Sequence, residues 1–302
     1  MAITVNDFAQ YIASFCTPNT CAVYRLAARR FLEQNTGAIG CDAVVRYVMD
    51  CTARKLAPAT IAAHIAGLKH LLAFARQRGE DVPADADMAP LNLPRVRTAV
   101  APTMTRDELA VYAEACRAHV REPYSTLMRL LPLSGLRVSE ACGLTIADLT
   151  PPGVSGSASY SIAVRPNEAR GVKGVADRAV VVLSVGTAML DYYCTEVYPT
   201  LAGFRGAASR WLFPQADGEP VKRRGVAEEF RRLRKHMGRA DLSPHACRHA
   251  HATLLEEAGW SLFAVMGQLG HESADTTSKY VHGSLEKRQR LAVNVDVGGE
   301  WL

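Results

Sequence analysis

Apolar residues recur every three or four positions in four stretches near the start of the chain. The first stretch, residues 4–15, places Phe8 and Ile12 on one side, and the fourth, residues 60–78, repeats the pattern. Asp42 precedes the apolar positions of the third stretch and is expected to cap it. This spacing is typical of amphipathic helices, so we predict a small four-helix domain here.

The apolar pattern stops in the next stretch, residues 81–102. Proline stiffens a chain and interrupts helices, so we predict an extended linker. Helix restarts at a capping box from Thr105 to Glu108. We therefore set the domain boundary near residue 100, with one domain over 1–100 and a second over 103–302. Four prolines support the linker, at positions 83, 90, 94 and 102.

The second domain changes character between residues 151 and 183. β-forming residues cluster at 160–164 and again at 178–183, which predicts a small antiparallel sheet. Helical patterns return over 186–197 and 221–237. The predicted fold class is mainly α with a small antiparallel β-sheet.

Composition and charge narrow the class of protein. The chain has 302 residues, 48% of them hydrophobic and 22% charged, and no apolar run approaches the ~20 residues of a membrane span. Its first residues lack the pattern of a signal peptide, and the eight cysteines show no metal-binding spacing. These features predict a cytoplasmic protein with reduced cysteines, no metal site and no membrane partner.

Basic residues concentrate in one stretch although the net charge is only +5. Residues 221–240 hold eight Lys or Arg against two Glu. Such a patch is typical of a surface that binds a phosphate backbone, but a solvated helix face has the same composition. Both interpretations stay open at this point.

A polar motif interrupts the apolar pattern between residues 243 and 282. Ser243-Pro begins a helix on which His245 and Arg248 lie three positions apart, on one face. Leu-Gly-His271 follows, and Tyr280 comes nine residues later. Each residue alone is most often a cap, a surface group or a packing residue, and only the combination indicates a site.

Two upstream motifs complete the set. Leu-Ser-Gly-Leu-Arg137-Val-Ser-Glu140 places a turn-forming glycine before an arginine and a carboxylate. Alone, Arg137 would be a buried arginine paired with an acid. Lys173 is the only lysine between Lys69 and Lys222, and it lies five residues before Arg178, in the predicted hairpin.

Together these motifs resemble those of the tyrosine site-specific recombinases of the phage-integrase type. In size the chain is similar to Xer recombinases and to transposon or integron integrases. The first domain resembles, in architecture alone, their helical core-binding (SAM-like) domain. The resemblance implies a DNA breaking-rejoining catalytic domain, with Glu140 supporting the site. Its catalytic residues would be Arg137, Lys173, His245, Arg248, His271 and Tyr280.

The resemblance also implies a mechanism without metal or other cofactor. Arg137 and Arg248 would neutralise the scissile phosphate, because guanidinium groups stay charged and bind two phosphate oxygens at once. Tyr280 would attack and form a covalent 3′-phosphotyrosine, with His245 accepting its proton. Lys173 would protonate the leaving 5′ oxygen, and His271 would hydrogen-bond the phosphate.

The implied partner is a double-stranded DNA recombination site. Two sites would assemble a homotetramer, or a hetero-tetramer with a paralogous recombinase, that exchanges strands through a Holliday junction; off DNA the protein would be a monomer or weak dimer. The tail, residues 283–302, is expected to dock in a neighbouring protomer, with docking in cis as the alternative. Nucleoid association is expected in the cytoplasm. The candidate DNA contacts are Arg29, Arg30, Lys222, Arg223, Arg224, Arg231, Arg232, Arg234 and Lys235.

Two other functions fit parts of the pattern. A type IB topoisomerase shares the arginines, lysine, histidine and tyrosine, and would relax supercoils without a specific site. An architectural DNA-binding protein with an inactive site would need the basic surfaces but not all six catalytic positions. The intact set argues against this second alternative.

Overall fold

The structure is a computed structural model, and it describes residues 3–35, 39–84, 102–154, 158–166, 177–202 and 209–270, with positions 292, 297 and 301. Contacts divide the chain into two compact units, Met1–Ala99 and Val100–Leu302. Each unit has its own hydrophobic core, as expected for domains that fold around separate apolar clusters.

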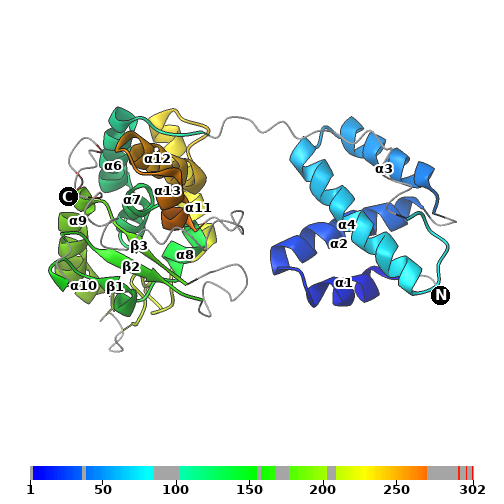
Figure 1. The fold of residues 1–302 in the computed structure, drawn as a ribbon, viewed down its shortest axis with the longest axis horizontal. Helices are drawn as coiled ribbons and strands as arrows, with labels where there is room; N and C mark the ends of the chain where they lie inside the picture. Colours follow the sequence, from blue (N-terminus) through cyan, green and yellow to red (C-terminus); the bar gives the residue numbers. More distant parts are fainter. Residues whose placement is uncertain are drawn as a thin grey trace. The chain divides into compact units, whose positions relative to one another are not determined.

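The described part of the first unit, up to residue 84, is a bundle of four helices (Figure 1). They are α1 (Val5–Ala13), α2 (Pro18–Gln34), α3 (Cys41–Ala53) and α4 (Pro58–Gln77). The predicted apolar stripes face inward: Phe8 and Ile12 of α1 are fully buried, and they share one core with Phe31 of α2 and Leu68 of α4. The four predicted helices are therefore confirmed.

The predicted cap of α3 is wrong by two positions. Gly40 is the N-cap residue of α3 and makes no side-chain cap. Asp42 lies inside the first turn, where its carboxylate pairs with Arg46 one turn further on. A carboxylate in the first turn still stabilises the helix through the helix dipole. Asp42 therefore does mark the start of α3, but as a first-turn residue and not as the N-cap.

The second unit is mainly helical. Its first half contains α6 (Arg106–His119), α7 (Tyr124–Ser134) and α8 (Val138–Cys142). The predicted helix over 186–197 is divided into α9 (Thr187–Tyr192) and a π-helical turn, which continues into α10. The further α-helices in the described part of this unit are α10 (Tyr198–Ala202), α11 (Arg223–Met237), α12 (Pro244–Glu257) and α13 (Leu262–Leu269).

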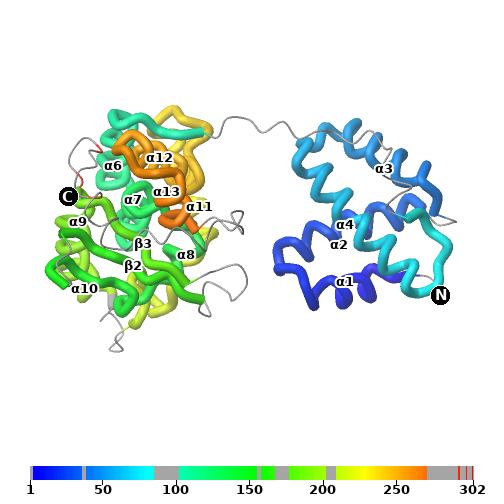
Figure 2. The backbone as a smooth tube through the Cα atoms, viewed as in Figure 1, coloured from blue at the N-terminus to red at the C-terminus, as the bar shows by residue number. Residues whose placement is uncertain are grey.

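A three-stranded antiparallel sheet, in the order β1–β2–β3, lies beside these helices (Figure 1). Figure 2 traces the backbone of the same elements and labels β2 and β3. Strands β2 (Ser161–Val164) and β3 (Arg178–Val181) are the predicted pair, with Ile162 opposite Val180. Strand β1 (Leu149–Thr150) pairs with the other edge of β2 and was not predicted, because two residues carry no alternation. The predicted fold class is confirmed.

Helix α7 is the centre of the second unit. Every residue from Ser125 to Ser134 is buried, and its leucines are fully enclosed. A helix that is buried on all sides must be surrounded by other elements, and here α6 and α12 pack against it. The end of α7 is therefore held rigidly, which matters because the site begins there.

Three tail positions are buried in the same chain. Ala292, Val297 and Trp301 belong to the core of the second unit, and Arg129 of α7 donates a hydrogen bond of 2.7 Å to the carbonyl of Trp301. These three positions have partners within the chain, as the cis alternative expects, and docking of the tail in a neighbouring protomer stays a prediction. The chain itself supplies the apolar core that the indole needs.

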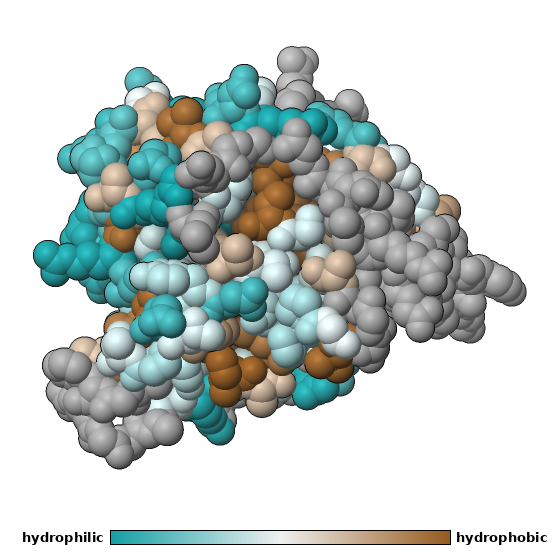
Figure 3. Space-filling view, turned by 90° about the vertical axis from the view of Figure 1, so that its left-hand side faces the viewer, coloured by the Kyte–Doolittle hydropathy of each residue, from teal (hydrophilic) through white to brown (hydrophobic). Residues whose placement is uncertain are grey.

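Arg129 also lines a pocket at the surface of the second unit. A pocket of about 460 Å³ is lined by Arg129 together with Met189 and Tyr192 of the α9 region. Figure 3 turns this side of the second unit toward the viewer, and brown apolar atoms appear there in small separate areas among polar ones. The described surface on this side is thus a mixed one without a broad apolar patch.

Candidate active site

The turn after α7 positions the first candidate arginine. Gly135 ends α7 in the left-handed region, at φ +65°. A Cβ there would lie 2.5 Å from Cδ2 of His251, so only glycine fits both the conformation and the space. Arg137 follows as the N-cap residue of α8, at the edge of the core rather than inside it.

Glu140 gathers two arginines on one buried carboxylate. Its side chain is 1% exposed, and Oε2 accepts the backbone N–H of Arg137 at 2.7 Å. Oε1 accepts from Nη1 of Arg137 at 3.0 Å. Arg178 of β3 donates from Nη1 and Nη2 to both carboxylate oxygens, at 2.9 and 2.8 Å. This two-pronged contact is the strongest geometry available to a guanidinium and a carboxylate.

The pKa of Glu140 follows from these contacts. Burial alone would raise the pKa of the carboxyl, but the hydrogen bonds and charge of Arg178 outweigh it, with a smaller contribution from Arg137. The net pKa lies below the ordinary value for glutamate. Glu140 is therefore ionised at neutral pH and carries a fixed negative charge at the base of the site.

Arg248 approaches the same place from α12. It is 5% exposed, and its two terminal nitrogens donate to the carbonyls of Gly135 and Leu269, each at 2.6 Å. These carbonyls end α7 and α13, where helix dipoles favour a cation. Burial and the neighbouring charge of Arg137 lower the pKa of Arg248 to about 10, so it remains charged at neutral pH.

The end of α13 closes the cluster. Gly270 terminates the helix in the left-handed region, at φ +66°. Its carbonyl accepts from Nη2 of Arg137 at 2.9 Å, and a Cβ on Gly270 would lie 2.8 Å from Nε of Arg178. Arg137, Arg178 and Arg248 thus all contact the last residues of α13, immediately before His271 in the chain.

A fully buried polar pair supports this arrangement from below. Gln268 of α13 donates to the carbonyl of Val181 at 2.7 Å and accepts from its N–H at 3.1 Å, so it binds β3 like an extra strand residue. His251 of α12 lies 3.4 Å from the Gln268 amide nitrogen and 2.9 Å from the carbonyl of Pro132. Helices α7, α12, α13 and strand β3 are therefore tied together.

The tautomer of His251 follows from its partners. A carbonyl only accepts, so Nδ1 of His251 must be protonated and donate to the carbonyl of Pro132, and Nε2 must accept from the Gln268 amide. Burial lowers the pKa of His251 to about 4, and the hydrogen bond to Pro132 offsets that only in part. His251 is therefore a neutral structural histidine.

His245 occupies a different environment from the arginines. It lies in the exposed first turn of α12, which Ser243 caps by accepting the N–H of Ala246. Its ring meets that of His249 edge to face, with centroids 4.4 Å apart. Burial, and then the charges of His245 and Arg248, lower the pKa of His249. His245 is thus exposed to solvent, three residues before the buried Arg248 on the same helix.

The structure thus brings three of the predicted residues, Arg137, Glu140 and Arg248, into one cluster. His245 lies on the same helix as Arg248. Lys173, His271 and Tyr280 lie outside the described residues. Among the described residues, no group of three or more His, Cys, Asp or Glu is placed to hold a metal ion.

Two residues of the cluster, Arg178 and Gln268, were not among the predicted site residues. Arg178 served there only to mark the start of a strand, although a charged residue opening the run Ala-Val-Val-Val was a signal that it had a buried partner. Gln268 was a similar signal, as the one strongly polar side chain in the apolar stretch 262–269. A buried polar group requires hydrogen-bond partners, and both residues have them.

The predicted basic contacts on α11 divide into groups. Arg231 and Lys235 are exposed on the helix, opposite the buried Phe230 and Leu233. Arg234 instead donates to the carbonyl of Leu242 at 2.6 Å and is half-buried, so it holds the chain after α11. Salt bridges engage two more members of the patch, Arg224 with Glu228 and Arg232 with Glu229.

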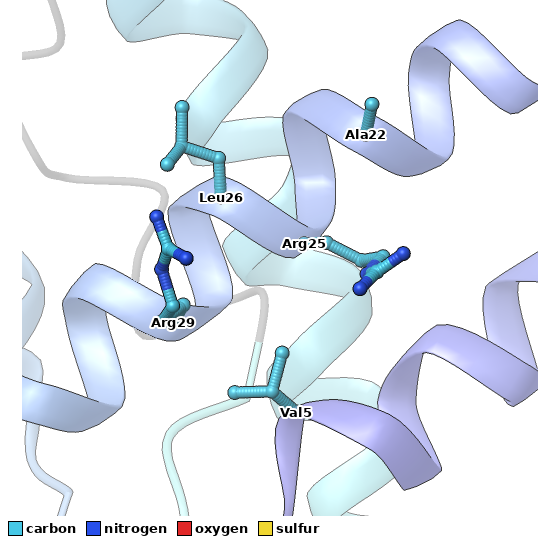
Figure 4. A pocket seen from close by; sticks show the side chains of 5 residues that line it. All are labelled: Val5, Ala22, Arg25, Leu26 and Arg29. Carbon is cyan, nitrogen blue, oxygen red and sulfur yellow. The ribbon is translucent and has the colours of Figure 1, made fainter.

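The first unit has a basic pocket of its own. It measures about 350 Å³ and is lined by Val5 of α1 and by one face of α2. Figure 4 shows Arg25 and Arg29 of α2 at this pocket, one turn apart. Arg30 is half-buried, and burial and then the charge of Arg30 lower the pKa of the nearby His64. Arg25 was not predicted and Arg30 points elsewhere, as adjacent residues on a helix do.

Comparison with known proteins extends the motif resemblance to most of the second unit. Residues 102–287 match the phage integrase family, and this span is more than half of the chain. The chain belongs to the phage integrase family. Among its relatives, tyrosine recombinase XerC of Agrobacterium fabrum is 29% identical over 285 residues, which is 87% of this chain and 83% of the relative. XerC of Roseiflexus castenholzii is 28% identical over 278 residues, with the same coverage of each chain.

Solved structures of this family share the fold. The Tn1549 transposon integrase, solved in complex with circular intermediate DNA, superposes with a TM-score of 0.68 at 19% identity, over 96% of this chain and 99% of that one. The XerH site-specific recombinase bound to a palindromic difH substrate gives 0.64 at 18% identity, over 96% and 84%. At these identities the likeness concerns the fold. No described helix of this integrase-family chain is long and apolar enough to cross a membrane.

Proposed function

We propose that the protein is a site-specific tyrosine recombinase, which cleaves and rejoins DNA through a covalent 3′-phosphotyrosine. The observation that carries the proposal is the paired arginines: Arg137 and Arg248 come from different helices, and both donate to the last residues of α13. The family model and the XerC relatives support the same activity. DNA strands would be exchanged through a Holliday junction.

The arginine pair suits phosphoryl transfer. The transition state at phosphorus gains negative charge, and groups fixed in advance stabilise it more than they stabilise the substrate. Arg137 keeps about two-fifths of its side chain exposed while Glu140 and Gly270 hold the rest. Its fork can therefore reach a phosphate oxygen without giving up its supports.

Tyr280 is the proposed nucleophile. It is the last of ten tyrosines and follows Leu269-Gly-His271 at the distance the family motif requires. Other tyrosines of the second unit are poor candidates, since Tyr112 and Tyr193 are fully buried and donate to backbone carbonyls. Burial also raises their pKa values, which opposes formation of the phenolate. His245 is the proposed base and Lys173 the proposed acid, with His271 on the phosphate.

Double-stranded DNA is the proposed partner, and two recombination sites would be held by four protomers, of one or two paralogous kinds. Arg231 and Lys235 of α11 and Arg25 and Arg29 of α2 are placed on exposed faces that suit phosphate contacts. The XerH structure contains DNA of a recombination site, which supports this class of partner. The proposed location is the cytoplasm, on the nucleoid.

A first experiment identifies the DNA site and tests the class of reaction. The protein is incubated with a library of random 40-bp duplexes in EDTA, and DNA that survives denaturing washes on the protein is sequenced. We expect one recurrent site with inverted halves. Two copies of that site on one plasmid should then yield recombined circles, whereas a type IB topoisomerase would only relax supercoils and would give adducts without a shared sequence.

A further inference from the structure

We infer that Arg178 is a positioning residue for the cleavage step, acting on the scissile phosphate through Glu140 and Arg137. It touches none of the reacting atoms. The inference rests on the proposed function, because it assigns a task to a residue that serves the proposed arginine pair.

The first support is the geometry of the two hydrogen bonds that the Arg178 guanidinium donates to the Glu140 carboxylate. Arg178 binds both oxygens of Glu140 at 2.9 and 2.8 Å, while the Arg137 guanidinium binds Oε1 at 3.0 Å and the Arg137 backbone N–H binds Oε2 at 2.7 Å. Two parallel bonds from Arg178 hold the plane of the carboxylate, so the direction of its bond to the Arg137 guanidinium is held as well. Arg178 therefore sets the plane in which the Arg137 guanidinium lies.

The second support is the distribution of charge. One carboxylate that is 1% exposed faces two guanidinium groups, so Glu140 neutralises only part of each. If Arg178 were absent, the negative charge of Glu140 would remain without one of its two cations. The net positive potential that the cluster presents to the phosphate would then fall, because the field of Glu140 opposes that of Arg137 there. Arg178 offsets the Glu140 charge and so preserves the attraction that the phosphate feels at Arg137.

The third support is the location of Arg178 in the chain. It begins β3, five residues after Lys173 in sequence. Its Nε lies 3.4 Å from the carbonyl of Gln268, and its guanidinium packs on Gly270, where a Cβ would come within 2.9 Å. One side chain thus contacts the Glu140 carboxylate and the last turn of α13, which leads to His271.

A purely structural role is the competing explanation. Breaking a buried ion pair destabilises a fold whatever its place, since the remaining charge is left without its partner. The chain supplies a matched comparison in Arg129, whose side chain is 7% exposed against 9% for Arg178 and which also pairs with a glutamate, Glu122. No described contact of Arg129 reaches Arg137, Glu140 or Arg248.

The test compares two substrates that differ only in charge at the scissile linkage. One is a duplex of the selected site, nicked so that the covalent adduct accumulates. The other carries a methylphosphonate, in which a methyl group replaces one non-bridging oxygen and removes the negative charge. Both diastereomers are measured separately. A neutral linkage depends less on Arg137, so a defect that acts through Arg137 should shrink on it.

For Arg178→Met we expect adduct formation on the phosphodiester to slow by about ten- to a hundredfold, as for other supporting contacts of an active site. On at least one methylphosphonate diastereomer the loss should be below about threefold. Arg178→Lys, which keeps the charge but lacks the fork, should show the same selective loss to a smaller degree. Arg129→Met should alter the rates on both substrates by one common factor.

Equal losses on both substrates for Arg178→Met would overturn the inference, and so would a wild-type rate for Arg178→Lys. If Arg178→Met does not fold, the test rests on Arg178→Lys alone. Its loss of adduct formation must then be larger on the phosphodiester than on the methylphosphonate. A different result would overturn the proposed function instead: no adduct from the wild-type protein on either substrate. The two failures are therefore distinguishable.

Discussion

The glycine that ends α7 allows a quantitative test of how the site is built. Gly135, at φ +65°, and Gly238, at φ +64°, both terminate helices in the left-handed region. A Cβ on Gly135 would lie 2.5 Å from His251 and 2.8 Å from Leu269, whereas a Cβ on Gly238 would meet nothing within 4 Å. Replacement by alanine therefore has the same backbone cost at both positions, and only at Gly135 does the added Cβ also clash with neighbouring side chains.

The expected magnitudes follow from these two effects. The left-handed conformation costs a residue with a Cβ roughly 1–2 kcal/mol, so Gly238→Ala should lower the free energy of unfolding by that amount. Gly135→Ala adds overpacking of about 1–3 kcal/mol, for a total of roughly 2–5 kcal/mol. His251 cannot move away easily, because both ring nitrogens are hydrogen-bonded in the core.

Tryptophan fluorescence during urea unfolding measures this effect in the full chain. All three tryptophans, at positions 211, 260 and 301, lie after residue 100 and are almost fully buried, so the signal reports the second unit alone. We expect the Gly135→Ala transition at clearly lower urea than that of Gly238→Ala, with similar slopes. Equal shifts would refute the steric argument at this turn.

Three further predictions concern pH, salt and the tail. Burial lowers the pKa of His251 to about 4 from an ordinary value of 6.5, so the unfolded chain takes up its proton first and stability falls as pH drops from 6.5 to 4, by at most about 3 kcal/mol. His251→Gln should flatten this part of a stability–pH curve measured with urea, and an unchanged slope would contradict the assignment. Replacing Arg231 and Lys235 by Ala should reduce the salt slope of DNA binding by roughly 2, measured by fluorescence anisotropy, while Arg239→Ala, whose side chain is paired with Glu108 and Asp241, should not. In a variant that keeps only Trp301, the emission should stay blue on dilution to nanomolar protein, because Trp301 is buried in cis; a red shift would indicate docking in a neighbour.

Local patterns predicted the helices and the outline of the site. The periodicity of Phe8, Ile12 and their neighbours predicted the first unit, and Gly135 predicted the turn that precedes Arg137. These features depend on interactions between residues close in sequence, which is why they could be read from one chain.

Contacts between distant segments could not be read in the same way. Arg178 lies 38 residues from Glu140, and Gln268 lies 87 from Val181, and no local pattern pairs them. The sequence signalled only that a polar group interrupted an apolar run. The tail shows the same limit, because its apolar residues suggested docking, and only the fold of the second unit supplied the partner, Arg129, for Trp301.

The most direct test of the central claim is to identify the residue that becomes linked to DNA. The protein is incubated in EDTA, without nucleotide, with the nicked duplex of its selected site, and the DNA-linked peptide is sequenced by mass spectrometry. We predict a 3′-phosphotyrosyl bond at Tyr280 and no adduct from Tyr280→Phe, which should still bind the site with unchanged affinity. An adduct at another residue, an adduct that survives Tyr280→Phe, or a strict need for Mg²⁺ would contradict the proposed mechanism.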